Sequence, residues 1–482
     1  MFQTFKKYYF ILCIFFSFAI HCVSSYFSIG FYSQDEHFQI LSPVEYLLGI
    51  NNSFLKDIWE FTPDYRIRPW FQSYIYFYMI KILNIFEIDN PFFLTFILRF
   101  FSSLLGFFSL LYFYLYFRNV YFKDTLFNKT IILLFFFYPY LHARTSSENI
   151  GTSIFIFGLI SFHKIFLSDN NSKYLLNSIL CGFLLGLAII VRYQFLIFVF
   201  ALFTWITLFY LSFYNIKKLF LIGLFILLVL IIGLIFDSSG YGSFNFTYYN
   251  YFYVNFIEGM LDFFGSDPWW YYFYITPINF APPIGLIFLL GLFILTIKKF
   301  NNILFFISIF SFLTFCFISH KELRFLFPLF FFSPFIICIF LENIKNVKIT
   351  KTLKYLIIIP NFIFLFVLSI IPATEQVKVY KFIYENNIKK NLYYLSDNPY
   401  IIAGLNPKLY TSHLPKISRF EQKFIEENNY YIVLNDYNDF QDFILNKNCK
   451  KKYSVYPEIV NKNPNWRKRK FNWYILYCIN NS

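Results

Sequence analysis

Long apolar runs constrain the fold of this chain more than any other feature of its sequence. They recur from Tyr8 to Ile371, and each has about 18 to 25 residues, enough to cross a hydrocarbon core of roughly 30 Å as a helix. Helices satisfy all their backbone hydrogen bonds internally, as lipid requires. Because 58% of the residues are hydrophobic and only 14% are charged, the sequence predicts an all-α polytopic membrane protein.

The apolar runs predict eleven transmembrane spans. They lie at residues 8–29, 70–86, 91–117, 149–167, 174–190, 193–214, 218–236, 277–297, 302–319, 325–342 and 353–371. One further run, Thr130–Leu141, gives only about 18 Å of helix at 1.5 Å per residue. We interpret it as a half-span or re-entrant segment that does not cross.

Positive charge orients these spans. With Lys6 and Lys7 in the cytosol, lysines fall repeatedly on the cytosolic side, as the positive-inside rule expects. They are Lys164, Lys173, Lys217, Lys218, Lys298, Lys299, Lys345, Lys348, Lys351 and Lys354. The same count places the basic segment Arg118–Lys129 on the opposite face, as an exception. The net charge of +14 is thereby explained by membrane insertion, and nucleic acid is not an expected partner.

The polar tail, residues 372–482, predicts a small extracytosolic α/β domain after the transmembrane domain of residues 1–371. Tyr430–Leu434 and Trp473–Tyr477 have the aromatic and β-branched composition of strands, and Asp439–Leu445 is a possible helix between them. Cys449 and Cys478 both fall in this tail, and two alternatives stay open for them: a disulfide or two free thiols. The other five cysteines lie in apolar runs without CxxC spacing, so no metal site is predicted.

The loop of residues 31–69 carries two adjacent carboxylates, Asp35 and Glu36, followed by His37. A carboxylate in this place can act as a general base and take a proton from an attacking hydroxyl. The alternative is a helix N-terminus whose acids are stabilised by the helix dipole. Later in the loop, Arg66 and Arg68 either grip a phosphate or lie at the interface with their charges in water.

Two further basic positions interrupt the apolar runs. Arg192 has almost no loop around it, and a charge so near hydrocarbon needs a partner, either a substrate phosphate or the interface itself. Ser319–Phe325 is the densest polar segment, and a cationic cluster of this kind suits a phosphate. It contains His320, Lys321, Glu322 and Arg324.

Two weaker motifs complete the polar segments. Arg144 and Glu148 have the spacing of an exposed helical ion pair. The segment Gly265–Tyr272 sets aromatic residues after a flexible turn. Its rings either anchor the headgroup region or stack on a sugar, with Asp267 contacting a hydroxyl and Trp269 lining a lipid groove.

Two of these motifs together resemble glycosyltransferase family 22. They are Asp35-Glu36-His37-Phe38-Gln39 and His320-Lys321-Glu322-Leu323-Arg324-Phe325. The resemblance covers most of the chain and implies a GT-C fold, and Gly265–Trp269 with the polar tail is most similar to the branch that assembles GPI anchors. Ser33-Gln34 stands where the family often has His-Pro, and Arg66-Ile67-Arg68-Pro69 departs from the GPI enzymes, so a bacterial relative acting on a surface glycan stays open.

The resemblance implies inverting transfer of mannose from dolichyl- or another polyprenyl-phosphate mannose to a lipid-linked glycan or GPI-type acceptor, with no cofactor. It implies Asp35 as base, with Glu36 positioning or replacing it. The donor phosphate would be held by His320, Lys321, Arg324 and Arg192. Arg66, Arg68, Asp267 and Trp269 would face the acceptor or lipid groove. The membrane would be the endoplasmic reticulum in a eukaryote or the plasma membrane in a bacterium.

A transporter or flippase of lipid-linked sugars is the alternative function. Transporters usually place their binding sites near the bilayer midplane, often between paired repeats. The ionisable residues here lie at one interface, which favours an enzyme. A scaffold without chemistry is a third possibility, but it leaves the acid pair unexplained.

Overall fold

The computed structural model describes residues 2–167, 174–389, 391–421, 429–465, 470 and 472–479. Lys173, assigned above to a cytosolic loop, lies outside these residues. The chain divides into two compact units. The helical unit comprises Met1–Tyr26, Ile58–Ile75 and Leu98–Ile370, and the mixed unit comprises Phe27–Asp57, Tyr76–Ile97 and Ile371–Ser482.

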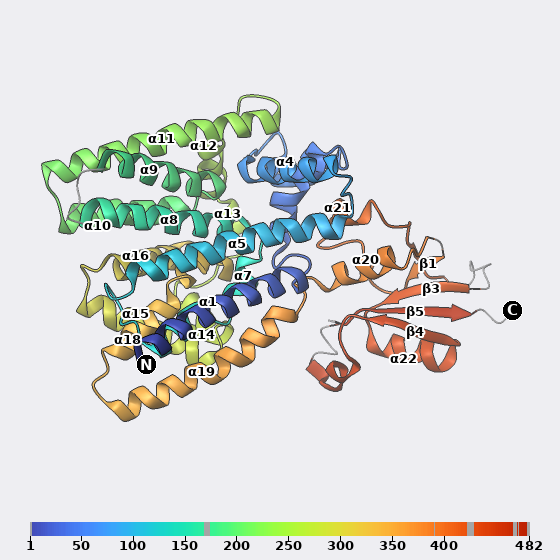
Figure 1. The fold of residues 1–482 in the computed structure, drawn as a ribbon. Coiled ribbons are helices and arrows are strands. Elements are labelled where there is room, and N and C mark those ends of the chain that lie inside the picture. The colour runs from blue at the N-terminus through green and yellow to red at the C-terminus, as the bar shows by residue number, and fades with distance from the viewer. Residues whose placement is uncertain are drawn as a thin grey trace. The chain divides into compact units, whose positions relative to one another are not determined.

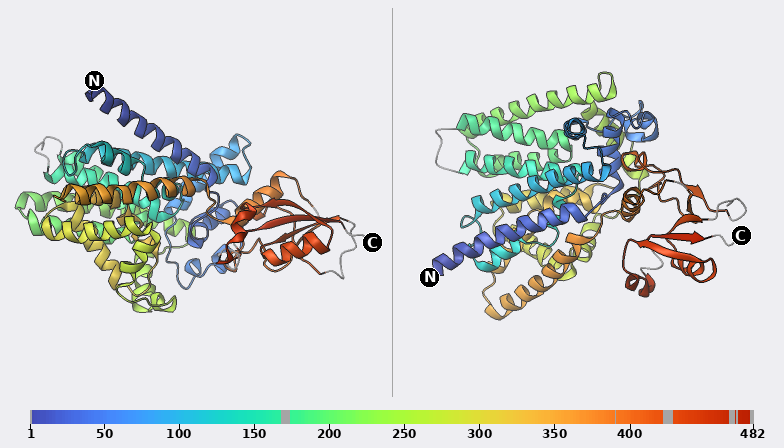
Figure 2. Two further views of the ribbon diagram at one scale, coloured as in Figure 1. Left: turned by 90° about the horizontal axis from the view of Figure 1, so that it is seen from below. Right: turned by 45° about the vertical axis from the view of Figure 1, so that its right-hand side comes forward.

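The longer helices of the chain follow the predicted apolar runs (Figures 1 and 2). They are α1 (Phe2–Phe27), α4 (Phe71–Ile85), α5 (Pro91–Phe117), α8 (Ser147–Leu167), α9 (Tyr174–Val191), α10 (Phe195–Phe209), α11 (Phe213–Tyr241), α15 (Pro282–Lys298), α16 (Ile303–Phe317), α18 (Ser333–Glu342) and α19 (Val347–Ile370). Leu323–Leu326 and α17 (Phe327–Phe330) precede α18.

By length and composition, six helices among the described residues are able to cross a membrane. They are Lys6–Phe27, Pro91–Phe117, Ser147–Leu167, Tyr174–Val191, Phe213–Tyr241 and Val347–Glu385. Two bent pairs raise the number to as many as eight: α15 with α16, bent by 119°, and Leu323–Phe330 with α18, bent by 54°. The polytopic helical architecture is confirmed, and the other predicted spans are shorter or broken helices.

Helices α1 and α5 run in opposite directions, which corrects the predicted topology. Near the C-terminal end of α1, Arg99 Nε donates to the carbonyl of Ser25 at 3.1 Å. Near its N-terminal end, the rings of Phe10 and Tyr114 stack 5.6 Å apart. The segment Arg118–Lys129 after α5 therefore lies at the same end of the helical unit as Lys6 and Lys7. It obeys the positive-inside rule rather than breaking it.

After Arg118–Lys129, the short run Thr130–Leu141 leads the chain back along α1. It forms α6 (Leu126–Leu133) and α7 (Tyr138–His142). Tyr9 and Thr130 share a hydrogen bond of 2.5 Å near the start of α1, and His21 and His142 share one of 2.9 Å twelve residues further along α1. The run therefore follows α1 from one end toward the other as two short helices, a passage that the predicted topology leaves out.

Helix α4 was predicted as a span and is not one. It has fifteen residues, and at 1.5 Å per residue its length of about 22 Å falls short of a hydrocarbon core of roughly 30 Å. Because α1 ends and α5 begins at the same end of the helical unit, the chain between them leaves and returns on one side. One predicted crossing is thus replaced by α6 and α7, which keeps the later helices in the predicted direction.

Small residues let α8, α9 and α11 pack closely. A Cβ atom on Gly182 would lie 2.6 Å from the carbonyl oxygen of Ile222, and one on Gly186 would lie 2.7 Å from Cβ of Val229. Since lipid supplies no hydrophobic drive between helices, such close backbone approach is what holds membrane helices together. This packing fixes the beginning of α8 and the end of α11, where polar residues gather.

The mixed unit contains a five-stranded sheet of order β2-β1-β3-β5-β4. The strands are β1 (Leu392–Tyr394), β2 (Ser418–Arg419), β3 (Asn429–Leu434), β4 (Cys449–Ser454) and β5 (Tyr474–Ile479). β1 is parallel to β2 and β3, whereas β5 is antiparallel to β3 and β4. The predicted strands at 430–434 and 473–477 coincide with β3 and β5.

Helices cover both faces of this sheet. Because alternate side chains of a strand point to opposite faces, Val433 packs with residues of α20 (Glu375–Glu385), while Ile432 packs with α22 (Tyr437–Asn446). The predicted helix 439–445 lies within α22. Cys449 and Cys478 are paired across β4 and β5 and form a disulfide. The small α/β region and the cysteine pair are therefore present.

The loop after α1 belongs to the mixed unit and is bound to the tail. Thr374 Oγ1 accepts from the amide of Phe31 at 2.9 Å and donates to its carbonyl at 2.7 Å. Gly30 has a φ of 91°, and a Cβ there would lie 2.6 Å from that of Thr374. Only glycine permits this close approach with a left-handed backbone. The sequence gives no sign that these distant segments fold together.

Candidate functional site

The acid pair stands at the start of a one-turn π-helix, Glu36–Leu41. Asp35 is half-buried, and its Oδ2 accepts from Nε2 of Gln39 at 2.5 Å. Glu36 is buried, and its Oε2 accepts from the amide of Tyr32 at 2.8 Å. Turns of π-helix occur often at functional sites. Of the two carboxylates, Asp35 is the more accessible to a substrate hydroxyl.

A buried carboxylate fixes the residues behind the acid pair. Glu45 is fully buried, and its Oε1 lies 2.9 Å from Nε2 of His37 and accepts from the amide of Leu409 at 2.7 Å. The ring of His37 stacks on that of Tyr410 with centroids 5.9 Å apart. The tail thereby fixes the position of the π-helix, and Glu45 is a residue that the sequence analysis did not single out.

In the helical unit, two guanidinium groups converge on one buried carboxylate at the beginning of α8. Arg192 Nη2 lies 2.9 Å from Oε1 of Glu148, and Arg324 Nη1 lies 4.0 Å from the same oxygen. The side chain of Glu148 is 2% exposed, and both arginines are buried. We call Glu148, Arg192, His320, Glu322 and Arg324 the cradle.

The second carboxylate of the cradle holds Arg324 through two hydrogen bonds. Arg324 Nε and Nη2 donate to the two oxygens of Glu322 at 2.6 and 2.7 Å. His320 Nε2 lies 3.3 Å from Oε1 of Glu322. The Glu322 side chain is 33% exposed, unlike that of Glu148. A planar guanidinium held in this fork geometry presents its charge in a fixed direction.

Lys321 holds the loop beside the cradle. Its ammonium donates to the carbonyls of Ile318 at 2.5 Å, Asp267 at 2.8 Å and Ser319 at 3.3 Å. Burial lowers the pKa of Lys321 below its usual range, and the nearby charge of Asp267 opposes that shift. An ammonium has three hydrogens to donate, and these three carbonyls match them. Lys321 thereby ties the segment before α14 (Tyr271–Asn279) to the His320 loop.

A second polar cluster lies at the end of α11. Asp237 accepts from the amide of Trp70 at 2.8 Å and from the hydroxyl of Tyr193, the neighbour of Arg192, at 3.1 Å. Arg68 forms an ion pair with Glu60. Arg66 donates to Oγ of Ser243 at 2.6 Å. Both arginines therefore lie beside the end of α11, whose Asp237 also contacts the neighbour of Arg192.

The aromatic segment contributes mainly backbone and exposed rings. The amide of Asp267 donates to the carbonyl of Ser319 at 3.0 Å. Trp269 is 60% exposed, and its ring meets that of Phe273 edge to face at 5.9 Å. These rings are available to a lipid or a sugar.

The structure brings Arg192 to the segment that carries His320, Lys321 and Arg324, from which it is far apart in the sequence. It also shows the roles of two carboxylates that the sequence analysis did not find: Glu148 was paired with Arg144, and Asp237 was not singled out. Helix α8 begins at Ser147, after Arg144, so these two residues do not share a helix. Arg144 instead lies over the ring of Tyr140, 4.8 Å from its centroid. The pairing predicted for Arg144 was wrong.

The cradle is suited to an anion. Two arginines and a histidine meet two carboxylates in it, through ion pairs to Glu148 and charge-assisted hydrogen bonds to Glu322. Among the described residues, no group of three or more His, Cys, Asp or Glu side chains could hold a metal ion. A phosphate that enters would find arginines already oriented by their carboxylates.

Comparison with solved structures defines the class of fold. ArnT from Cupriavidus metallidurans bound to undecaprenyl phosphate has a TM-score of 0.54 at 9% sequence identity, and the match covers 97% of each chain. The same protein in the apo state gives 0.51 at 11% identity, again over 97% of each chain. The oligosaccharyltransferase from Archaeoglobus fulgidus in the apo form gives 0.49 at 12% identity, over 87% of this chain and 65% of that one. The fold is that of the GT-C membrane glycosyltransferases.

The family is shown by sequence. A model of the Alg9-like mannosyltransferase family matches residues 11–400. The chain therefore belongs to the Alg9-like mannosyltransferase family, and it is a multi-pass membrane mannosyltransferase that uses a lipid-linked sugar donor. A search of curated proteins finds no match to this sequence.

Proposed function

We propose that the protein transfers mannose, with inversion, from a polyprenyl-phosphate mannose to a hydroxyl of a lipid-linked glycan or GPI-type acceptor. The observation that carries this proposal is the cradle, where Arg192 and Arg324 converge on Glu148 beside His320. Inverting transfer needs a base for the acceptor and a site for the departing phosphate. The acid pair and the cradle supply one each.

In this mechanism the carboxylate of Asp35 takes the proton of the acceptor hydroxyl as its oxygen attacks the anomeric carbon. The bond from that carbon to the phosphate oxygen breaks, and the polyprenyl phosphate leaves as an anion. Arg192, Arg324 and His320 stabilise that anion, so no separate acid is needed. Lys321 acts as a positioning residue through its three carbonyl contacts.

The acid pair follows in the sequence from the same end of α1 that the cradle adjoins. The chain passes from the C-terminal end of α1 to Asp35. Within the helical unit, that end of α1 also adjoins the beginning of α8: Ser103 donates to the carbonyl of His21, and its neighbour Ser102 accepts from Asn149 at 2.9 Å. Glu148 of the cradle precedes Asn149. Arg66, Arg68, Asp267 and Trp269 are then candidates to face the acceptor or the prenyl chain.

The deciding experiment measures transfer from radiolabelled polyprenyl-phosphate mannose to glycolipid acceptors in membranes that carry the protein. Asp35→Asn is expected to lower the rate by about 100-fold or more, because removing a general base typically costs about 10²–10⁴ in rate. Asp57→Asn changes an exposed carboxylate of the same loop and serves as the matched control, with wild-type transfer expected.

Two outcomes would contradict the proposal. Undiminished transfer by Asp35→Asn, with loss in Glu36→Gln, would assign the base to Glu36. No transfer from any polyprenyl-phosphate mannose to a GPI-type or N-glycan precursor would remove the proposed acceptors. Locating the tagged protein in its own cells distinguishes the endoplasmic reticulum membrane from a bacterial plasma membrane.

A further inference from the structure

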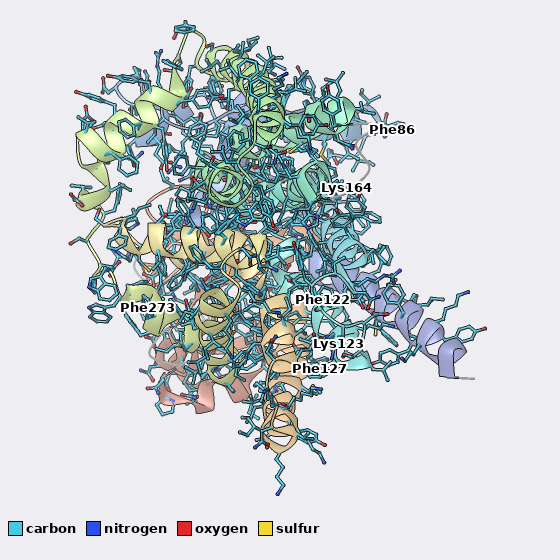
Figure 3. The ribbon with its side chains drawn as sticks, turned by 90° about the vertical axis from the view of Figure 1, so that its left-hand side faces the viewer. Phe86, Phe122, Lys123, Phe127, Lys164 and Phe273 are labelled. Atoms are coloured by element: carbon cyan, nitrogen blue, oxygen red, sulfur yellow. A yellow bond between two sulfur atoms is a disulfide. The ribbon has the colours of Figure 1, made fainter. Side chains whose placement is uncertain are left out.

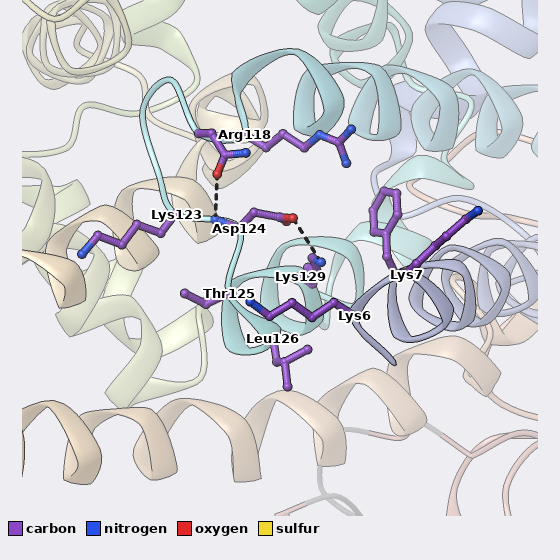
Figure 4. Close-up of a pocket in the computed structure, with 10 residues that line it drawn as sticks. Lys6, Lys7, Arg118, Lys123, Asp124, Thr125, Leu126 and Lys129 are labelled. Atoms are coloured by element: carbon purple, nitrogen blue, oxygen red, sulfur yellow. Dashed lines mark hydrogen bonds and ion pairs between the residues drawn. The ribbon is translucent and has the colours of Figure 1, made fainter. Parts of the chain in front are cut away.

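A large basic cavity lies at the end of the helical unit opposite the cradle. It has a volume of about 840 Å³ and is lined by residues of α1, of the loop after α5 and of α6 (Figure 4). Its charged lining residues are Lys6, Lys7, Arg118, Lys123, Asp124 and Lys129. Five cations thus surround one carboxylate, and the cavity is strongly positive.

The carboxylate of this cavity is already engaged. Asp124 lies 3.1 Å from Nζ of Lys129 and also accepts from the hydroxyl of Tyr114. Outside the lining, Glu342 accepts from the amide of Lys123 at 2.9 Å and from Nδ2 of Asn128 at 2.6 Å. Among the described residues, these two carboxylates pair with neither Lys7 nor Arg118, so the cavity keeps a positive charge.

A ring inside the cavity positions two of its cations. The guanidinium of Arg118 and the ammonium of Lys129 each lie 5.4 Å from the ring centroid of Phe10. Cation–π contacts of this kind hold a charge without neutralising it. In Figure 4, Lys123 extends away from Lys6 and Lys7.

Lys7 of the cavity lies one helical turn before Ile11, so the edge of the cavity borders an exposed apolar stripe of α1. Tyr8, Ile11, Leu12 and Phe15 are exposed on this helix, directly after Lys6 and Lys7. α1 is one of the helices able to cross a membrane. Figure 3 views the helical unit from this end, with Lys123 and Lys164 labelled. A ligand with an anionic head and apolar chains would fit both surfaces, and a free anion would use only one of them.

We propose that this cavity binds the phosphate headgroup of an anionic phospholipid, with the acyl chains along α1. The lipid would come from the leaflet on the side where Lys6 and Lys7 lie. Basic pockets between membrane helices are suited to such headgroups. The site is distinct from the cradle, because it lies at the N-terminal end of α1 and the cradle adjoins the C-terminal end. It does not depend on the proposed transfer reaction.

The test measures binding of fluorescently labelled phosphatidic acid to the purified full chain in nonionic detergent by fluorescence anisotropy. The variant Lys7→Gln with Arg118→Gln removes two lining cations of the cavity and leaves the Lys129–Asp124 pair in place. About fivefold weaker binding is expected for each charge removed, and about 30-fold for the pair. Lys217→Gln with Lys299→Gln removes two exposed lysines outside the cavity and is expected to bind as wild type does.

Each result decides for or against the proposal. Support requires that unlabelled phosphatidic acid displaces the probe, that phosphatidylcholine does not, and that only the cavity variant weakens binding. Equal loss in both double variants would reduce the effect to net charge and overturn the site. Displacement by millimolar inorganic phosphate as readily as by phosphatidic acid would show a site for free anions. Gel filtration and thermal unfolding confirm that the variants remain folded, and Lys7→Gln alone provides a milder variant.

Discussion

The buried carboxylate of the cradle offers the sharpest test of its electrostatics. Glu148→Gln keeps the shape of the side chain and removes its charge, which leaves Arg192 and Arg324 without the anion on which they converge. Because Glu148 and both arginines are buried, water cannot easily replace the lost charge. We expect the variant to be clearly less stable than wild type.

The magnitude follows from the two distances. At an effective dielectric constant of about 20, unit charges separated by 2.9 Å attract by about 6 kcal/mol, and those separated by 4.0 Å by about 4 kcal/mol. Desolvation offsets much of this, and breaking a buried pair typically costs about 3–5 kcal/mol. With an unfolding entropy of about 2.1 cal/mol/K per residue, a chain of 482 residues changes its unfolding midpoint by about 1 °C per kcal/mol, so we expect about 3–5 °C.

Glu322→Gln is the matched control. It removes the other carboxylate bound to Arg324, but this side chain is 33% exposed, and partly exposed ion pairs contribute about 0–1 kcal/mol. The assay is thermal unfolding in detergent, with and without a short-chain polyprenyl phosphate. The ligand should raise the midpoint of Glu148→Gln more than that of wild type, because its phosphate replaces the lost anion.

Two results would refute this reasoning. If Glu148→Gln unfolds at the wild-type midpoint, the two arginines do not depend on Glu148. If Glu322→Gln loses as much stability as Glu148→Gln, burial does not set the strength of these pairs.

Two further predictions concern packing and the disulfide. Gly240→Ala should lower stability by about 1–3 kcal/mol, because its Cβ would lie 2.1 Å from the buried ring of Trp70. On the same helix, the Cβ of Gly223→Ala would meet nothing within 4 Å, so this variant should gain about 0.5–1 kcal/mol of stability. Thermal unfolding compares the two variants, and equal changes would contradict the tight fit at Trp70. Replacing Cys449 and Cys478 by serine should destabilise the mixed unit by about 3–4 kcal/mol, from the entropy of a loop with a sequence separation of 29. Limited proteolysis of the tail with and without reductant measures it, and identical digestion would argue against the bond.

Much of the fold was predictable, because long apolar runs in lipid have essentially one solution. The same was true of β3 and β5, whose aromatic and β-branched composition indicated strands. The error over α4 and α6–α7 had a physical cause. Hydropathy counts apolar residues, so it favoured the continuous run 70–86 over a run broken at Leu134. The charge pattern favoured the observed topology, because Arg118 and Lys123 fit the positive-inside rule only in that topology.

The candidate site was less predictable than the fold. Its basic residues stood out because a charge beside hydrocarbon is rare. Their carboxylate partners did not, because Glu148 and Asp237 lie at helix ends where an acid is unremarkable. Glu45 was hidden for another reason: its partners include the amide of Leu409, and no local pattern reveals a backbone contact across the chain. Pairing of buried charges is decided by tertiary packing, which one sequence does not display.

The hydrogen bond from Leu409 to Glu45 has a consequence for the order of synthesis. The two residues are 364 positions apart, and a ribosome that adds about 5–20 residues per second needs about 20–70 s to span that distance. During this interval the segment that carries Asp35 has already left the ribosome. The part of the tail that holds it in place has not yet been synthesised. The nascent chain is therefore held in an unfinished form until its final quarter is translated, and a chain cut short after α19 would keep its helices but lack the support of its acid pair.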